Sequence, residues 1–333
     1  MAVLALGLYG LTIAYAGRTL SEAISAAFLL IGLEALDRPE RGARDGFVAG
    51  CALGLSVVAW YPAAVAVLAA LAWCLWTRRF HHLWGVCIAG SAISLGLGAL
   101  DSWTWKSPFH SLYAYLDYNV ISDRAAQDLG ARPAMFYLPY VLGWLPVWAW
   151  VGLPFALRLE RAVPLPLLCA LVELIALSLT PRKEVCFLYP ALVLVALGAA
   201  PGLWVALQKV RRPVFRVSVA CLALCVGLAP CFFQRDVRGD QFHAIVRASR
   251  GEDATGLLLV NEGLWGAGGY FYIGKNIPWW TCDSPEDDSF RAAMADRRIN
   301  RVVVFEGKGF VALERNGFRV VDQIGRATIL VRP

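Results

Sequence analysis

Long apolar runs separated by short polar segments make up roughly the first two thirds of the chain. Uncharged runs of about 16 to 24 residues recur from the N-terminus to about Phe233, and the charged residues gather between them. A helix needs about 20 apolar residues to cross the hydrocarbon core of a membrane. The pattern therefore predicts a mostly α, polytopic transmembrane helical bundle of roughly eight or nine spans.

Proline and charge indicate where the spans begin and end. The run 46–76 is too long for one perpendicular helix and contains Trp60-Tyr61-Pro62 near its middle. Because proline lacks an N–H and clashes with the preceding turn, we expect two helices or one broken helix there. The other expected spans cover residues 2–16, 23–36, 84–100, 134–157, 163–179, 185–207 and 214–233.

Beyond Phe233 the pattern becomes that of a water-soluble domain. Short runs rich in β-branched residues have the length of strands. These expected strands are Gly256–Val260, Asn300–Phe305 and Ala327–Val331. The segment Ser284–Arg298 has acidic residues early and arginines late, which suits a helix. We therefore expect a membrane bundle over residues 1–233 and a small α/β domain over residues 234–333.

Composition agrees with a membrane protein. Hydrophobic residues make up 58% of the 333 residues and charged residues only 17%, which excludes an ordinary soluble domain. The net charge of +6 lies in short loops rather than on one patterned face, so we expect no nucleic-acid partner. The nine cysteines are scattered singly without the paired spacing of metal ligands, so we expect no metal site.

The distribution of loop cations predicts the orientation in the membrane. Cation-rich loops hold Arg38, Arg41 and Arg44; Arg78 and Arg79; Arg158 and Arg161; and Lys209, Arg211, Arg212 and Arg216. The positive-inside rule makes these loops cytoplasmic. The loops 17–22, 101–133 and 182–184 and the C-terminal domain then lie on the extracytoplasmic or lumenal side. The membrane itself is either a bacterial inner membrane or that of the endoplasmic reticulum.

Arg182, Lys183 and Glu184 form a charged triplet between two apolar runs. A charge at the bilayer centre costs about 2.5 to 3.5 kcal/mol on insertion scales, so the triplet must lie at an interface or face a polar cavity. A snorkelling basic loop is the simplest interpretation of such a triplet. The residues that follow it favour a functional site.

The stretch Arg182-Lys183-Glu184-Val185-Cys186-Phe187-Leu188-Tyr189-Pro190 resembles a signature of the mannosyltransferases that use dolichyl-phosphate mannose. The family's pattern is His-Lys-Glu-x-Arg-Phe-hydrophobic-aromatic-Pro. Arg182 stands where the family has His, and Cys186 stands where it usually has Arg. That family includes enzymes of glycosylphosphatidylinositol-anchor and asparagine-linked glycan assembly.

Two more segments resemble the same family in the same order. Gly17-Arg18-Thr19-Leu20-Ser21-Glu22 is similar to its Arg-Thr-Leu-Ser/Thr-Asn segment, with Glu22 in place of Asn. A Ser beside a helix start is also a common N-cap. Residues 101–120, from Asp101 to Asn119-Val120, are similar to its Asp-x-x-x-Tyr-Gly-x-Trp to Phe-Leu-x-Phe-Asn-Val segment, and Trp144-Leu145-Pro146 falls at its Leu-Pro. The aromatic stretch 108–120 also suits a helix or aromatic belt at the membrane interface.

The resemblance implies a GT-C fold and an inverting glycosyltransferase. Such an enzyme moves a hexose, mannose in this family, from a polyprenyl-phosphate donor to a lipid-linked or other extracytoplasmic glycan acceptor. The implied reaction needs no cofactor, and membrane lipids surround the bundle. The implied donor-phosphate ligands are Arg18, Arg182 and Lys183, because cations stabilise a phosphate leaving group. The implied substrate-binding residues are Glu22, Asp117 and Asn119.

The catalytic base is the open point of this interpretation. Inverting transfer needs a carboxylate to accept the proton of the acceptor hydroxyl. The family's usual base is an Asp in an outer loop that has no counterpart here, so we expect the chain to be truncated at its N-terminus or its start to be misassigned. Glu184 and Asp101 are the remaining candidates, and either could instead organise the site through ion pairs and hydrogen bonds.

Two other functions stay open at this point. A catalytically inactive relative would bind the lipid-phosphate sugar or act as an accessory membrane subunit, and would show donor binding without turnover. A transporter would carry ionisable residues within its spans and similar halves. Only Glu173 lies well inside an expected span, and no internal repeat is visible.

Overall fold

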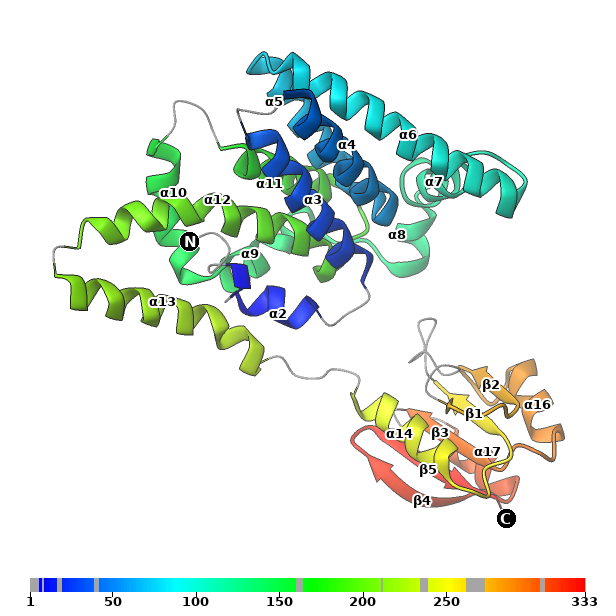
Figure 1. Cartoon of the computed structure of the whole chain (residues 1–333). Helices are drawn as coiled ribbons and strands as arrows, with labels where there is room; N and C mark the ends of the chain where they lie inside the picture. Colours follow the sequence, from blue (N-terminus) through cyan, green and yellow to red (C-terminus); the bar gives the residue numbers. More distant parts are fainter. Residues whose placement is uncertain are drawn as a thin grey trace. The chain divides into compact units, whose positions relative to one another are not determined.

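The structure is a computed structural model, and it divides the chain into two compact units, Met1–Gln234 and Arg235–Pro333. The described residues are 6–7, 9–16, 20–38, 42–159, 164–210, 212–233, 239–261, 273–305 and 309–332. Figure 1 shows that the first unit is helical and that the second contains the sheet.

The first half of the helical unit ends in a long helix at its periphery. Its elements are α2 (Gly10–Ala16), α3 (Ser21–Asp37), α4 (Gly42–Ala59), η1 (Tyr61–Ala63), α5 (Ala64–Trp76) and α6 (Phe80–Trp105). The break expected at Pro62 is confirmed, because α4 ends at Ala59 and the 3₁₀ turn η1 leads into α5. α3, α4 and α6 lie side by side (Figure 1). α6 continues past the predicted end of its span at Leu100 to Trp105.

The second half contains shorter elements and the central helix α12. Its elements are α7 (His110–Leu116), η2 (Asp117–Ile121), α8 (Arg124–Leu129), η3 (Ala134–Tyr137), α9 (Leu138–Trp144), α10 (Val147–Leu159), α11 (Leu165–Leu179), η4 (Val185–Leu188), α12 (Tyr189–Gln208) and α13 (Pro213–Phe233). The span expected over 134–157 is a bent pair of helices in the structure, because the chain turns by 102° between Trp144 and Val147. Pro146 at the bend lacks the N–H that would continue the helix.

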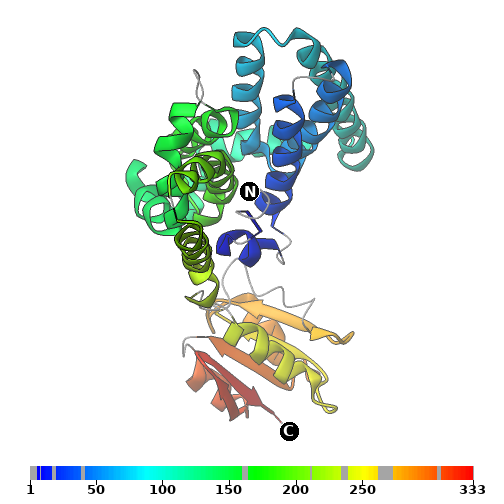
Figure 2. The same ribbon diagram turned by 60° about the vertical axis from the view of Figure 1, so that its left-hand side comes forward.

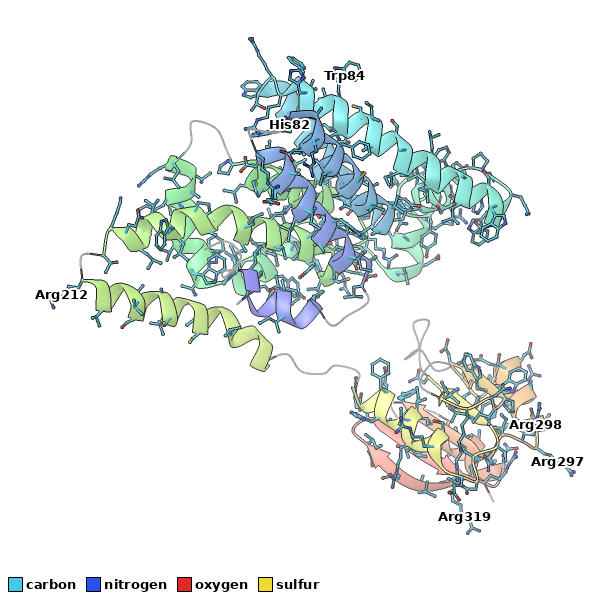
Figure 3. All side chains as sticks on the ribbon, in the orientation of Figure 1. His82, Trp84, Arg212, Arg297, Arg298 and Arg319 are labelled. Carbon is cyan, nitrogen blue, oxygen red and sulfur yellow. The ribbon has the colours of Figure 1, made fainter. Side chains whose placement is uncertain are left out.

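By length and composition, two of the described helices can cross a membrane, Phe80–Trp105 and Val185–Gln208. A third span results if the bent pair Ala134–Trp144 and Val147–Leu159 is counted as one. Most side chains of α12 are buried inside the bundle. The side chains of α6 are largely exposed, among them Trp84, which points away from the bundle in Figure 3.

Glycines allow two helix pairs to touch through their backbones. A Cβ atom at Gly202 of α12 would lie 2.1 Å from the carbonyl oxygen of Gly152 in α10, so no side chain fits there. A Cβ atom at Gly46 of α4 would lie 2.4 Å from the carbonyl oxygen of His82 in α6. These contacts fix α12 against α10 and α4 against α6.

The second unit is a five-stranded sheet with helices on both faces. Its elements are α14 (Gly239–Arg250), β1 (Leu257–Val260), β2 (Trp279–Cys282), α16 (Asp288–Ala295), β3 (Arg301–Phe305), α17 (Phe310–Arg315), β4 (Arg319–Ile324) and β5 (Ala327–Val331). The strand order is β2-β1-β3-β5-β4. β2, β1 and β3 are parallel, whereas β5 pairs antiparallel with β3 and β4.

The sheet separates two apolar cores. α14 covers one face, where Ile245 packs with Leu257 and Ile329 (Figure 2). α16 and α17 cover the other face, where Phe290 and Leu313 pack together. The three expected strands and the helix expected within 284–298 are confirmed, and the structure adds α14, α17 and the edge strands β2 and β4.

Candidate functional site

The charged triplet lies in a short loop between α11 and η4. α11 ends at Leu179, and Thr180 adopts an extended backbone because the next residue is proline. The Thr180 hydroxyl donates to the carbonyl oxygen of Leu177 at 2.8 Å, which satisfies one free carbonyl at the helix end. Glu184 is also extended, and η4 begins directly after it. The extended backbone at Thr180 and Glu184 therefore sets the shape of the loop that carries the charges.

Lys183 is buried, with only 6% of its surface exposed. Its Nζ donates to the carbonyl oxygen of Arg132 at 3.2 Å and to that of Thr180. The backbone N–H of Arg132 in turn donates to the carbonyl oxygen of Pro181 at 3.0 Å. Burial lowers the pKa of the Lys183 ammonium group. Lys183 therefore connects the triplet to the segment before η3, using two of its three N–H donors.

Arg182 lies in a half-enclosed aromatic setting. Its guanidinium group pairs with the Glu184 carboxylate, and its side chain is only 17% exposed. The guanidinium carbon lies 6.0 Å from the centre of the Phe187 ring. Among the described residues, the buried Nε atom has no hydrogen-bond partner. Because arginine presents a planar fork of donors, this leaves donor capacity for an oxyanion.

Glu22 and Glu184 approach the same thiol group. The Sγ atom of Cys186 lies 3.5 Å from Oε2 of Glu184. The charge of Glu22, at the start of α3, also acts on this thiol, and Glu22 is itself only 5% exposed. The Ser21 hydroxyl donates to Oε2 of Glu22 at 3.1 Å. A thiol thus stands between two carboxyl groups, at the position where the family signature has an arginine.

Asp101 is buried and hydrogen bonded. Its Oδ2 atom accepts hydrogen bonds from the backbone N–H of Ser111 at 2.9 Å and from the Ser111 hydroxyl at 2.6 Å. The same hydroxyl lies 2.8 Å from the Tyr61 hydroxyl, and the Tyr61 ring packs 5.1 Å from that of Tyr115. The Arg182 charge acts on Tyr115, whose pKa is raised chiefly by burial. Asp101 of α6 therefore bonds Ser111 of α7, and Ser111 in turn bonds Tyr61 of η1.

Asp117 and Asn119 make local contacts in η2. The Asp117 carboxylate pairs with Arg124, and Nδ2 of Asn119 donates to the carbonyl oxygen of Tyr115 at 3.0 Å. The neighbouring Tyr118 donates to Oδ2 of Asp128 at 3.1 Å, and the Arg182 charge reaches it. Arg18 lies outside the described residues.

Glu22, Arg182, Lys183 and Glu184 thus gather around one loop, whereas Asp101 is hydrogen bonded to Ser111, which contacts Tyr61. Sequence reasoning missed Tyr137, Tyr115, Ser111 and Arg132. The Tyr137 side chain is 2% exposed, and its buried hydroxyl has no hydrogen-bond partner among the described residues. The high density of aromatic residues in 113–140 was a usable signal for the two tyrosines.

An apolar groove of about 600 Å³ lies beside this polar loop. Its walls come from α2, α3 and α12 and include Thr12, Ala23, Ala27, Tyr189 and Val193. Ala23 directly follows Glu22, and Tyr189 follows η4. The ring of Tyr189 stacks on that of Tyr15 with centroids 4.6 Å apart. The apolar lining of the groove and the charged residues are therefore neighbours in sequence at the starts of α3 and α12.

A helical membrane bundle with buried cations and carboxyl groups on one loop, joined to a small α/β unit, defines a glycosyltransferase of the GT-C class. The chain belongs to the Alg9-like mannosyltransferase family, whose model matches residues 1–246. This confirms the resemblance seen in the signature segments, and the chain is a glycosyltransferase.

Solved structures of similar fold include ArnT from Cupriavidus metallidurans bound to undecaprenyl phosphate. The TM-score is 0.64 at 16% identity, covering 99% of this chain and 78% of that one. The same protein in the apo state matches with a TM-score of 0.58 at 13% identity, with the same coverage of 99% and 78%. A comparison with curated proteins gives no match.

Proposed function

We propose that this protein transfers a hexose, mannose by its family, from a polyprenyl-phosphate donor to a lipid-linked or other extracytoplasmic glycan acceptor with inversion. The observation that carries this proposal is the apolar groove of about 600 Å³ beside the buried charged loop. A polyprenyl-phosphate sugar has a hydrocarbon chain and a phosphate, and the two surfaces match these parts. The structural neighbour bound to undecaprenyl phosphate supports the same donor class.

The residues divide into donor-phosphate ligands and carboxyl groups. Arg182, whose guanidinium group pairs with Glu184 and whose side chain is 17% exposed, is the proposed ligand of the phosphate oxygens, which gain charge as the glycosidic bond breaks. Lys183 fixes the loop through carbonyl oxygens and adds positive charge behind it. Arg18 remains a proposed third cation. Asp117 and Asn119, in η2, are the proposed substrate-binding residues.

The proposed base is the Glu184 carboxylate, with Glu22 beside it. Glu184 is 43% exposed at its side chain and borders the same space as Arg182. A carboxylate next to the reacting centre can take the proton of the acceptor hydroxyl. Asp101 already accepts two hydrogen bonds from Ser111, which supports a positioning role for it.

The proposed topology has eight or nine spans, with the unit 235–333 on the extracytoplasmic or lumenal side. The positions of the loop cations support this orientation. Lys209 and Arg212 follow the apolar run that the triplet precedes, and Arg78 and Arg79 lie in another cation-rich loop of the same predicted side. Accessibility of single engineered cysteines at 78 and 297 to a membrane-impermeant maleimide tests the proposal. Labelling of position 297 alone from outside supports it, and labelling of position 78 contradicts it.

Transfer of labelled mannose from polyprenyl-phosphate mannose by the full chain in nanodiscs tests the activity. Polyprenyl-phosphate glucose in a parallel assay tests the sugar, and proton NMR of the released glycoside tests inversion. We expect transfer with mannose, and loss of transfer in Arg182→Ala. Absence of transfer with both donors and a set of lipid-linked acceptors would overturn the enzymatic proposal.

A second function, donor binding without turnover, is favoured by Cys186. The thiol stands at the position where the family signature usually has an arginine, so the site has one cation fewer. Cys186→Arg distinguishes the two functions. If the wild type binds polyprenyl-phosphate mannose without transfer and the arginine variant gains transfer, then the binding function is correct for the natural chain.

A further inference from the structure

The second unit contains a cleft of about 920 Å³ that has no part in the proposed glycosyl transfer. α14 forms one wall, β4 forms the other, and residues of β5 form the floor. The volume lies within the range of about 300 to 1,000 Å³ that small-molecule sites occupy. α14 lies along this face of the sheet in Figure 2.

The wall formed by α14 is basic because its polar residues recur at helical spacing. His243, Arg247 and Arg250 follow each other at steps of four and three residues, so they lie on one side of α14. The side chains of Ala244, Ile245 and Ala248 occupy the buried side and hold α14 on the sheet. All three polar residues are exposed and line the cleft.

These arginines keep unused donors. Nε of Arg247 lies 3.5 Å from Oδ2 of Asp322, and the two side chains are 73% and 42% exposed, so this pair is open to competition from another anion. For Arg250, no ion pair is recorded among the described residues of the second unit. A third arginine, Arg301 at the start of β3, borders the cleft and is held by Asp253.

The strand wall departs from regular geometry at the cleft. Val320 pairs with Leu330 and Asp322 with Ile329, so Val321 is an extra residue that forms a β-bulge. In a regular strand neighbouring side chains point to opposite faces, but Val321 and Asp322 both line the cleft. Bulges re-aim side chains in this way and are frequent beside functional sites.

We propose that this cleft binds a phosphate monoester carried on a small organic group. Two guanidinium groups from one helix side suit the oxygens of a phosphate, and Arg247 would exchange its distant contact with Asp322 for the ligand. Apolar side chains of the lining, Ile324 of β4 with Ile329 and Val331 of β5, accept the carbon part. The proposal is independent of the activity of the helical unit.

The test uses the full chain in nanodiscs of phosphatidylcholine, titrated calorimetrically with two probes. Glycerol 3-phosphate presents the phosphate alone, and dihexanoyl phosphatidic acid presents it as a lipid headgroup. Binding of both supports a soluble phosphate ester, and binding of the lipid alone supports a headgroup. Binding of neither probe overturns the proposal.

Paired variants place the binding in the cleft. Arg247→Gln with Arg250→Gln should weaken binding about tenfold or more, because the phosphate loses both guanidinium groups. The control, Arg297→Gln with Arg315→Gln, makes the same charge change on exposed arginines outside the cleft. Figure 3 shows Arg297 pointing away from the unit. Equal affinity of the two double variants would contradict the cleft as the site.

Hydrogen exchange separates loss of the site from loss of the fold. The probe that binds should slow exchange in peptides covering 239–250 and 319–324. Unchanged exchange in β1 and β3 of the cleft variant shows that its fold is intact. Protection confined to the helical unit would overturn the proposal.

Discussion

The charged triplet of the helical unit and the surface arginines of the sheet unit hold their positive charges in opposite ways. In the helical unit, Lys183 is 6% exposed and the Arg182 side chain 17%, and the partners of Lys183 are backbone carbonyl oxygens. In the sheet unit, Arg291 and Arg298 are 72% and 69% exposed and pair with acids two or three residues away. Exposed pairs of this kind contribute about 0 to 1 kcal/mol.

Burial is what makes the first group informative. A buried cation loses the hydration that an exposed one keeps, so it persists only where hydrogen bonds or a ligand compensate. Lys183 has its compensation in two carbonyl oxygens, whereas Arg182 has one carboxylate and an Nε atom with no partner among the described residues. Buried charge with spare donors therefore indicates a site better than the number of cations does.

Arg182→Ala should have the largest effect. Loss of a preorganised donor to a developing oxyanion costs about 10² to 10³ in kcat, and Arg182→Lys should recover little because lysine lacks the planar fork. The measurement is kcat/KM for mannosyl transfer from the polyprenyl-phosphate donor. Arg291→Ala, an exposed arginine in the sheet unit, is the control and should leave transfer unchanged. Equal activity of both variants would remove the contrast between the units.

Lys183→Met should destabilise the helical unit. The change leaves the carbonyl oxygens of Arg132 and Thr180 without their donor, at a cost of about 1 to 3 kcal/mol. Heat denaturation of the solubilised protein, followed by the fluorescence of its tryptophans, measures the loss. Lys275→Met is a matched control, because Lys275 is exposed and donates to the carbonyl oxygen of Gly251 at 2.7 Å. A larger effect at position 275 would show that burial is not the deciding factor.

Asp101→Asn should reduce transfer by about tenfold, since one net charged hydrogen bond to Ser111 is worth about 1.5 to 3 kcal/mol and the amide keeps part of it. The loss should fall on kcat with little change in donor affinity, because Asp101 acts through Tyr61 and Tyr115. Asp117→Asn, in an exposed pair with Arg124, is the comparison. An unchanged kcat in Asp101→Asn would assign this carboxylate to stability alone.

The smallest effect is a pH dependence in the sheet unit. Burial raises the pKa of the Asp240 carboxyl, but hydrogen bonds from Arg326 outweigh it and hold the pKa below 3.8. A depressed folded-state pKa gives stability that is present above the unfolded pKa and lost as pH falls through the folded one. Hydrogen exchange in α14 and β5, corrected for the intrinsic rate, should therefore rise below about pH 4. In Arg326→Gln, hydrogen exchange in α14 and β5 should change less with pH. Exchange in the helical unit, which lacks this ion pair, is the comparison.

Local patterns in the sequence predicted much of the fold. Pro62 predicted the break after α4, and the runs 256–260, 300–305 and 327–331 predicted the central strands β1, β3 and β5. The edge strands were missed because their residues face solvent. β4 in particular contains a bulge that interrupts its alternation.

Long-range contacts account for what was missed in the site. Lys183 bonds a carbonyl oxygen 51 positions away, and carbonyl oxygens leave no trace in the identity of a residue. Ser111, ten positions from Asp101, is an ordinary residue until its partner is known. The charged triplet itself was visible because uncompensated charge between apolar runs is rare.

The backbone contact between Gly152 and Gly202 constrains how the enzyme can be recombined. A Cβ at 202 would lie 2.1 Å from the facing oxygen, so no side chain is present there to adapt to a different spacing of α10 and α12. α12 continues directly from η4 and the triplet. Chimeras that exchange the signature segment with that of a relative must therefore exchange α10 along with it.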